Sequence, residues 1–448
     1  MAKPSDLYKT PPHDAQAEKS ILGAVLIDSS SLSLVAEFVL PHHFYLREHA
    51  LIYEAMLKLY QEQKPIDIVT LKNQLKNDGN LKAVGGTEYL SELINVVPTS
   101  AYIEQYGQIV KSVFTKRKLI EVSSRSVEQA FEDEGDIKQL IDDVEASIFA
   151  LAQEYQHRDF IQLKEIVQDR FEELEEFAKS GEHTRGIATG FSLLDSKLSG
   201  LQKSNLVVLA ARPGIGKTSF ALNIALHAAM HGKKSVGFFS LEMSKEELVD
   251  RLLVGQADVD AWRLKTGKLT DDDTKAIVSA MGELATASIF IDDTPGISIL
   301  EMRTKARKLK AERGLDLVIV DYLQLADAGR RFESRVQEVT FVSQGLKNLA
   351  RELKIPVLSL SQLSRAVEQR GIKKPQLADL RESGAIEQDA DVVLFIYQEQ
   401  DNADLLDSNQ KIVKVNIAKH RNGPTGELEL MFRGDRVKFY SVDKSSSI

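Results

Sequence analysis

The sequence contains no cysteine among its 448 residues, which excludes disulfide bonds and metal sites built from thiolates. It also lacks any apolar run approaching the roughly 18 to 20 residues that span a bilayer. Residues 1–6 show no apolar stretch of the kind found in a secretory signal. These absences, with 43% hydrophobic and 27% charged residues, predict a soluble, cytoplasmic globular protein without a membrane partner.

The chain is too long for one ordinary core, and its pattern divides it into three parts. Residues 1–155 read as helical, because apolar residues recur at helical spacing up to a last long helix at 137–151. Residues 156–187 read as a linker, and from 188 to 448 short β-rich runs alternate with helices. We therefore predict an all-α N-terminal domain, a linker, and an α/β domain with a mainly parallel sheet.

The N-terminal part shows no catalytic constellation. His42, His43 and His49 are candidate metal ligands, but no cysteine and no patterned carboxylate accompanies them. We interpret them as surface and helix-start histidines. A helical domain without chemistry is more typical of a docking or assembly module.

The linker contains one amphipathic helix, which must bury its apolar stripe somewhere. It could pack on its own chain, or it could dock on a neighbouring subunit. The sequence leaves both open. The stripe consists of Leu163, Ile166, Val167, Phe171, Leu174 and Phe177.

Seven short β-rich runs predict the strands of the C-terminal domain, and a hairpin is predicted to follow them around Arg433-Gly434-Asp435. Helical stretches separate most of these runs, which favours parallel strands covered by helices. The predicted strands are 206–210, 236–239, 289–291, 317–320, 357–360, 392–396 and 412–417, and the hairpin pairs 427–432 with 437–440.

A glycine-rich loop follows the first of these strands and opens into a helix that begins around Ser219. Backbone N–H groups in such a loop and at a helix N-terminus bind phosphate oxygens. Lys217 adds a full charge for the β- and γ-phosphates, and the Thr218 hydroxyl can ligate Mg²⁺. Ala211 replaces the usual first glycine. The sequence thus predicts an ATP site with the phosphate-binding loop Arg212-Pro213-Gly214-Ile215-Gly216-Lys217-Thr218.

Two further strands end in a carboxylate. Asp321 ends the strand at 317–320, where it could cap a turn or organise a magnesium ion; beside a phosphate-binding loop, we favour the magnesium role. Glu242 follows the strand at 236–239 and precedes the capping box of the next helix. It can orient water or accept its proton, so we predict that Glu242 is the general base rather than an ordinary loop acid.

Two other polar groups have alternative interpretations. Gln362 could sense the γ-phosphate or satisfy backbone groups at the end of its strand. Lys419 and Arg421 follow a strand and precede a turn. They could reach into the phosphates of a neighbouring subunit or form a solvated basic turn.

These segments, in this order, resemble the family of bacterial replicative helicases, the DnaB family, whose motor has a RecA-like core. The helical first part is also similar, from Pro11-Pro12 onward, so the resemblance covers essentially the whole chain. The segments that carry it are 188–195, the phosphate-binding loop, 240–243, 320–325, 361–365 and 379–391.

The resemblance implies a homohexameric ring that hydrolyses ATP at subunit interfaces and moves 5′ to 3′ on single-stranded DNA. It implies that Glu242 is the catalytic base, Asp321 the magnesium-organising acid and Gln362 the γ-phosphate sensor. Lys419 and Arg421 become fingers that act on the nucleotide of the neighbour. The linker helix becomes the element that docks on the adjacent motor domain. Arg251 resembles the residue that packs on the base.

The resemblance also implies contacts with DNA and with protein partners. It makes the N-terminal domain a collar that recruits primase, and it implies a helicase loader. By the same resemblance, the protein is expected to hold DNA through the DNA backbone. Aromatic side chains on which bases could stack are not evident in the implied DNA-binding loops. The implied DNA-binding residues are Arg381, Glu382 and Gly384, with added charge near Arg330, Arg331 and Arg335.

The net charge of −9 alone argues against a nucleic-acid partner, because such proteins usually carry a basic footprint. A basic inner wall with an acidic exterior would reconcile the charge with DNA. Two other functions share the nucleotide site. A RecA-type recombinase lacks a helical front domain of this size, and a P-loop ATPase or kinase without nucleic acid would not respond to single-stranded DNA.

Overall fold

The structure is a computed structural model that divides into two compact units, an N-terminal unit at Met1–Ile161 and a C-terminal unit at Gln162–Ile448. The predicted boundaries at 155 and 187 stay predictions. The residues that the structure describes are 10–97, 99–132, 137, 140, 144, 147–148, 151, 162–180, 184–328, 332, 334–364, 367, 374–380, 384–398 and 410–442.

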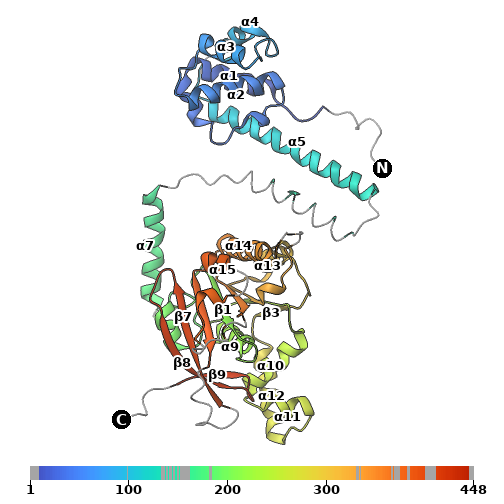
Figure 1. The fold of residues 1–448 in the computed structure, drawn as a ribbon, viewed down its shortest axis with the longest axis vertical. Helices are drawn as coiled ribbons and strands as arrows, with labels where there is room; N and C mark the ends of the chain where they lie inside the picture. The colour runs from blue at the N-terminus through green and yellow to red at the C-terminus, as the bar shows by residue number, and fades with distance from the viewer. Residues whose placement is uncertain are drawn as a thin grey trace. The chain divides into compact units, whose positions relative to one another are not determined.

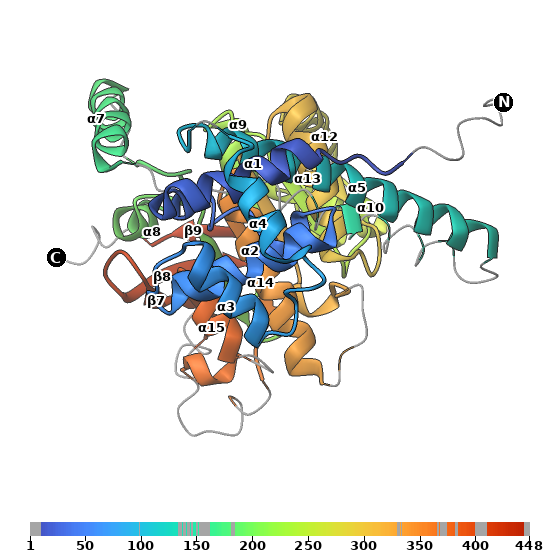
Figure 2. The ribbon, with the colours of Figure 1, turned by 90° about the horizontal axis from the view of Figure 1, so that it is seen from above.

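Every regular element in the described residues of the N-terminal unit is a helix, as the sequence predicts. Its last described helix, α5, extends beyond the compact group formed by the others (Figures 1 and 2). The helix predicted at 137–151 is described at only some of its residues, and these are helical. The elements are α1 (Ala15–Ile27), η2 (Ser29–Leu34), η3 (Pro41–His43), α2 (Arg47–Gln61), α3 (Ile68–Asn77), α4 (Gly86–Ile94) and α5 (Ile103–Glu132).

A buried carboxylate joins three of these helices. Glu18 on α1 is fully buried and accepts hydrogen bonds from the backbone N–H groups of Tyr45 and Leu46, at 2.6 and 3.3 Å. These amides precede α2, whose own N-cap residue makes no side-chain hydrogen bond to the described chain. The third partner of Glu18 is His49 Nδ1 on α2, at 2.7 Å, while His49 Nε2 lies 2.7 Å from the Tyr89 hydroxyl on α4. Glu18 therefore caps α2 from another helix.

The interpretation of the three histidines is correct only in part. His42 is exposed, but His43 and His49 are buried, so for these two the predicted surface position is wrong. The reason is the pairing of His49 with Glu18, which compensates both buried groups. His43 packs against the ring of Phe114 on α5, with ring centroids 4.5 Å apart.

In the described part of the C-terminal unit, nine strands form one sheet in the order β3-β2-β4-β5-β1-β6-β7-β8-β9. Pairs from β3 to β6 are parallel and pairs from β6 to β9 are antiparallel. All predicted strands and the hairpin are confirmed. The strands are β1 (Leu206–Ala211), β2 (Val236–Ser240), β3 (Ile289–Asp292), β4 (Leu317–Asp321), β5 (Val357–Gln362), β6 (Val392–Tyr397), β7 (Gln410–His420), β8 (Gly426–Arg433) and β9 (Lys438–Ser441).

Helices cover both faces of this sheet, so its central strands are buried on both sides. Alternate residues of β1 enter different cores. Val207 and Leu209 pack with α9 (Lys217–Met230), whereas Leu206 and Val208 pack with α13 (Ile299–Arg313) and α14 (Arg335–Leu353). This three-layer arrangement fixes the carboxyl ends of β1, β2, β4 and β5 along one edge, where the functional groups gather.

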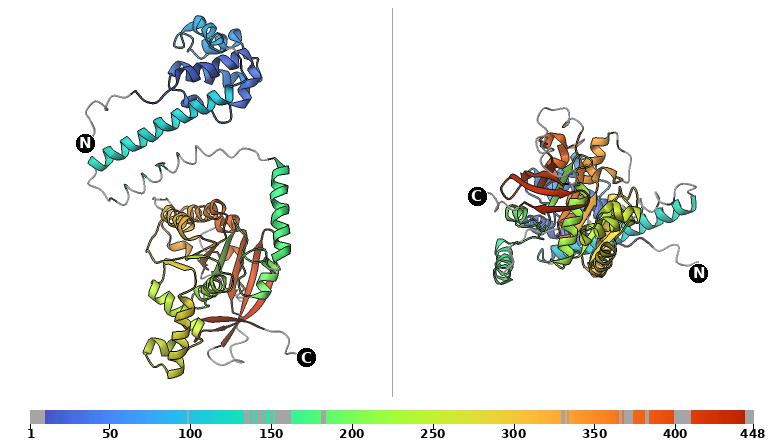
Figure 3. Two further views of the ribbon diagram at one scale, coloured as in Figure 1. Left: turned by 180° about the vertical axis from the view of Figure 1, so that it is seen from behind. Right: turned by 90° about the horizontal axis from the view of Figure 1, so that it is seen from below.

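Among the remaining helices of the C-terminal unit, α8 and α10 add buried residues to the core on the α9 side, and α15 adds one to the core on the side of α13 and α14. Helices α10, α11 and α12 form a group at one end of the unit (Figure 3). No helix in the described part of the chain has both the length and the apolar character needed to cross a bilayer. The bounds of the remaining helices of the C-terminal unit are α7 (Leu163–Ser180), α8 (Ser192–Leu198), α10 (Lys245–Ala257), α11 (Ala261–Thr266), α12 (Asp271–Leu284) and α15 (Gly384–Asp389), with η4 (Leu323–Leu325) and η6 (Leu377–Asp379).

We predict that Glu18→Ala lowers the free energy of unfolding of the N-terminal unit by about 3 kcal/mol, because two partly buried amides and the buried His49 lose their acceptor. Hydrogen exchange of α1 and α2 in the full chain measures the loss, with α9 as the internal reference. Glu92→Ala is the control, since the Glu92 carboxylate is 59% exposed and pairs only with Lys19 among the ion pairs described. Equal exchange in both variants would contradict the capping role.

Candidate active site

The phosphate-binding loop connects β1 to α9 and needs two glycines in left-handed conformations. Gly214 has φ +80° and Gly216 has φ +95°, which side chains rarely adopt. Gly216 also lies under two aromatic rings, because a Cβ there would be 3.0 Å from the ring tips of Phe432 and Phe439. These rings belong to β8 and β9 and stack 4.5 Å apart. The last strands of the sheet therefore support the loop from one side.

Asp321 at the end of β4 collects the two polar side chains that begin α9. It is fully buried, and its Oδ2 accepts a 2.6 Å hydrogen bond from the Thr218 hydroxyl. Its Oδ1 receives no hydrogen bond from the described residues, and the Lys217 ammonium lies 3.3 Å from it. The same ammonium lies 4.3 Å from the centre of the Tyr322 ring. A buried anion with such an oxygen beside a hydroxyl is a suitable environment for a hard cation.

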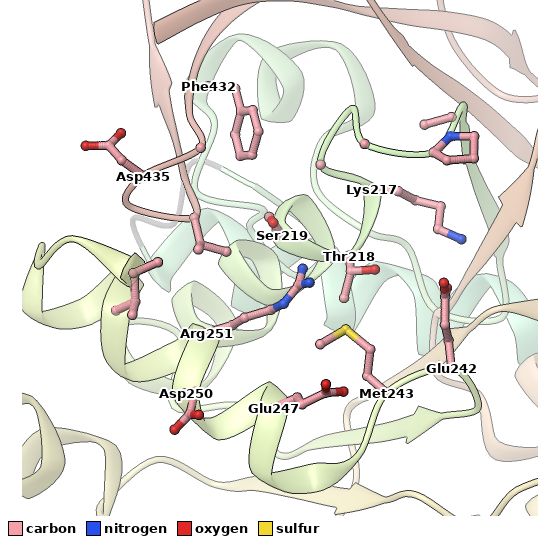
Figure 4. Close-up of a pocket in the computed structure, with 18 of the residues that line it drawn as sticks. Lys217, Thr218, Ser219, Glu242, Met243, Glu247, Asp250, Arg251, Phe432 and Asp435 are labelled. Carbon is pink, nitrogen blue, oxygen red and sulfur yellow. The ribbon is translucent and has the colours of Figure 1, made fainter. Parts of the chain in front are cut away.

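Glu242 reaches the same edge from β2. The register pairs Ser240 with Asp321, and the backbone N–H of Leu241 donates to the Asp321 carbonyl at 2.6 Å. Ser244 then caps α10 with the expected capping box, so Glu242 lies outside the helix. Its side chain is exposed and reaches the same end of the cavity as Lys217 (Figure 4).

Lys217, Thr218, Glu242 and Phe432 are among the residues that line a cavity of about 1200 Å³. Lys217 and Glu242 lie at one end, Phe432 and Asp435 at the other, and Arg251 on α10 points between them (Figure 4). This arrangement fits a nucleotide whose phosphates lie on the loop and whose base lies near Arg251. The contact predicted for Arg251 remains a proposal.

The far end of the cavity contains residues that the sequence reasoning missed as site residues. Asp435 and Val437 come from the turn between β8 and β9, and Leu264 and Lys265 from α11. Burial acts to raise the pKa of Asp435, but the hydrogen bond and charge of Arg433 outweigh it, so the pKa of that carboxyl lies below its ordinary value. The sequence identified the hairpin, but no local signal linked it to a loop so far away in the chain.

Gln362 lies at the end of β5, beside the end of β1. The register pairs Gln362 with Ala211, immediately before the phosphate-binding loop, and Gln362 lines the cavity. Arg212 on the loop donates to the carbonyl of Leu363 at 2.9 Å. The site therefore brings together the loop, Asp321, Glu242 and Gln362, all from one edge of the sheet.

Lys419 and Arg421 lie at the opposite edge. Strand β7 runs antiparallel to β6, and Lys419 pairs with Val393 near the beginning of β6. The Arg421 guanidinium is 3.7 Å from Asp391, whose carboxylate accepts from the backbone N–H at the start of β1. A strand of this length separates them from the loop of their own chain by roughly 15 Å. The structure does not bring them into this cavity.

The residues predicted to contact DNA are described only in part. Gly384 is exposed at the start of α15. Arg381, Glu382, Arg330 and Arg331 lie outside the described residues. Within the described ranges, the structure contains no cluster of three or more histidine and carboxylate side chains that could hold a metal ion on its own.

Comparison with known families matches both units. Residues 186–441 match the family described as the DnaB-like helicase C terminal domain, and residues 10–112 match the DnaB-like helicase N terminal domain. The replicative DNA helicase DnaC of Bacillus subtilis (strain 168) is 41% identical over 97% of this chain and 96% of its own length. The replicative DNA helicase DnaB of Geobacillus stearothermophilus is 41% identical over 98% and 97%.

Two solved structures are also similar. A DnaB-like replicative helicase, described with its interactions with primase, has a TM-score of 0.76 at 32% identity over 96% of this chain and 100% of its own. A second structure, described as an ATPase domain, has a TM-score of 0.59 at 37% identity over 64% of this chain and 100% of its own. The predicted fold class, a helical N-terminal domain and an α/β domain with a mainly parallel sheet, is confirmed.

The two loop glycines differ in what surrounds them, which gives a matched pair of variants. Gly214→Ala meets no described atom within 4 Å and adds only backbone strain of about 1–2 kcal/mol. Gly216→Ala adds the same strain and also pushes on the rings of Phe432 and Phe439. We expect Gly216→Ala to raise the Kd for a fluorescent nucleotide by about tenfold more than Gly214→Ala. Equal Kd values for the two variants would show that the rings do not support the loop.

Proposed function

The chain belongs to the family of DnaB-like replicative helicases, and we propose that it works as a homohexameric ring that moves 5′ to 3′ on single-stranded DNA. Family membership makes it an ATP-dependent helicase of DNA replication. One observation supports the proposal of a ring. The groups that bind and activate the nucleotide lie at one edge of the sheet, and the cations expected to complete the site lie at the other.

ATP is proposed to bind with its phosphates on the loop at 212–218. The backbone N–H groups of the loop and the start of α9 face the phosphate oxygens, and Lys217 leaves Asp321 for the β- and γ-phosphates. Asp321 and Thr218 would hold Mg²⁺, since the buried Oδ1 accepts no hydrogen bond from the described residues and the hydroxyl lies beside it. When bound, the ion neutralises charge between the phosphates.

Hydrolysis is proposed to use Glu242 and Gln362. Glu242 orients a water molecule and accepts its proton as the water oxygen bonds to the γ-phosphorus and the bond to the ADP oxygen breaks. Gln362 responds to the presence of the γ-phosphate. The position of both side chains in the wall of the cavity supports these roles, with Glu242 at the same end as Lys217.

Lys419 and Arg421 are proposed to act on the nucleotide of a neighbouring subunit. The Arg421 side chain is 68% exposed and is anchored to Asp391 at the far edge of the sheet. From that edge, Arg421 cannot reach the nucleotide cavity of its own subunit, but a head-to-tail interface places it at the cavity of the neighbouring subunit. Six such interfaces close the proposed ring.

Helix α7 supports the same assembly. Its apolar side chains Leu163, Val167, Phe171 and Leu174 are 71%, 56%, 66% and 50% exposed. An apolar stripe with that exposure needs a partner surface. We propose that α7 docks on the adjacent C-terminal unit, where α12 offers exposed Val278 and Met281.

DNA is proposed to be held through its backbone by residues after the ends of β4 and β5, including Gly384, Arg381, Glu382, Arg330 and Arg331. Phosphate contacts suit a motor that tracks DNA without reading its bases. With a net charge of −9, the cations must be concentrated on the DNA-facing surface.

The N-terminal unit is proposed to recruit primase, and the ring to be loaded by a helicase loader. One similar structure is described with its interactions with primase, and this chain carries the matching N-terminal domain. We propose that the protein acts in the cytoplasm, at the replication fork. The recombinase alternative is not favoured, because the matches cover both units of a replicative helicase.

The function is tested by unwinding of a forked duplex that carries a 5′ single-stranded tail. We expect ATP-dependent strand separation by the wild type, and Lys217→Ala should lower hydrolysis and unwinding by about a hundredfold or more. Lys203→Ala, an exposed lysine before β1, is the control. Strand exchange between homologous duplexes without unwinding of the fork would contradict the helicase function.

The interface role of Arg421 is tested by mixing subunits. Arg421→Ala should bind ATP almost normally but hydrolyse it about a thousandfold more slowly. Mixing it with Lys217→Ala should restore part of the activity, because some interfaces then combine an intact loop with an intact Arg421. Arg313→Ala, an exposed arginine on α13, is the control. If no mixing ratio restores turnover, Arg421 does not act in trans.

A further inference from the structure

We propose that Gln324 is a positioning residue that holds the backbone of Gln362 and links it to Arg335 at the start of α14. The side chain of Gln324 is only partly exposed and lies in η4, directly after Asp321 and Tyr322. This inference rests on the proposed role of Gln362 in sensing ATP and adds a specific connection from that residue towards the DNA side.

The side chain of Gln324 continues the sheet where the strand pairing stops. The ladder between β4 and β5 ends at Val320 and Ser359. Beyond it, Gln324 Nε2 donates to the Ser361 hydroxyl at 2.8 Å and to the Gln362 carbonyl at 3.4 Å. Gln324 Oε1 accepts from the backbone N–H of Gln362, also at 3.4 Å. One amide group thus replaces a missing stretch of neighbouring strand.

The other side of Gln362 is held by the strand that carries the phosphate-binding loop. Ala211 pairs with Gln362, and the backbone N–H of Leu363 donates to the Ala211 carbonyl at 3.2 Å. The backbone of Gln362 is therefore fixed between β1 and Gln324. A change at the γ-phosphate that pulls on Gln362 has to move Gln324 as well, because the amide bridges its backbone N–H and carbonyl.

The backbone of Gln324 continues the connection to α14. The Arg335 guanidinium donates to the Gln324 carbonyl and pairs with Glu338 one turn further along α14. Arg335 is 42% exposed at its side chain, and Ser334 caps the helix. Helix α14 also packs against α15, which begins at Gly384. Gln324 therefore connects the sensor strand to a cation on the side proposed for DNA.

The connection explains how single-stranded DNA could change the rate of ATP hydrolysis without touching the nucleotide. DNA that shifts Arg335 moves the Gln324 carbonyl, and the amide of the same residue transmits the shift to Gln362. Thermodynamic linkage requires the reverse effect as well, so ATP binding should change the position of Arg335.

Gln324→Met tests this connection, since methionine keeps the length of the side chain and removes its hydrogen bonds. We expect the ratio of kcat with oligo-dT to kcat without it to fall about threefold to tenfold, as for the loss of one or two hydrogen bonds. The KM for ATP should stay unchanged, because no group that touches the nucleotide is altered. Gln344→Met is the control, an exposed glutamine on α14.

Two further variants keep the test decisive if Gln324→Met is unstable. Ser361→Ala removes the 2.8 Å hydrogen bond and should give a smaller loss of the same ratio. Gln324→Met should add nothing in an Arg335→Ala background, since the connection is then already broken. The melting temperature and the KM for ATP separate this loss from general unfolding.

The outcomes distinguish this inference from the proposed function. An unchanged ratio in Gln324→Met and in Ser361→Ala, with normal unwinding, overturns the role of Gln324 and leaves the helicase function in place. A wild-type ATPase that does not respond to oligo-dT and does not unwind a fork overturns the proposed function itself. Additive losses in the double variant also reject the connection.

Discussion

The C-terminal unit depends on one buried carboxylate at the end of a central strand. Asp321 is fully buried, and an isolated charge in that position would be costly. Thr218 and Lys217 at the start of α9 compensate this charge. The Asp321 carboxylate at the end of β4 therefore holds the beginning of α9, the helix that follows the phosphate-binding loop. The neighbouring strands then bring Glu242 and Gln362 to the same edge. Compensation of one charge thereby determines the geometry of the whole site.

A second carboxylate plays a comparable part at the opposite edge. Asp391 accepts from the backbone N–H of Leu206 and pairs with Lys347 and Arg421. Leu206 begins β1, and the phosphate-binding loop follows the end of the same strand. The loop that a subunit uses and the finger proposed for its neighbour are thus joined by one buried strand.

Much of the fold can be predicted from the sequence because its signals are local. The strands are short apolar runs bounded by turn residues, and the phosphate-binding loop is contiguous, so both are located without a structure. Contacts between distant segments are not predictable in this way. Nothing near His49 in the sequence indicates that Glu18 would bury it. Likewise, the support of Gly216 by Phe432 depends on sheet order, and the sequence does not decide between a solvated turn and a finger for Arg421.

The support of the phosphate-binding loop by the last two strands also has a consequence for synthesis of the protein. The ribosome releases β1 and α9 well before β8 and β9, which carry the rings of Phe432 and Phe439 that lie on Gly216. Until then the loop lacks one wall. We expect a nascent subunit to acquire its affinity for nucleotide only after β9 has emerged, so that chains still lacking this strand do not compete for ATP.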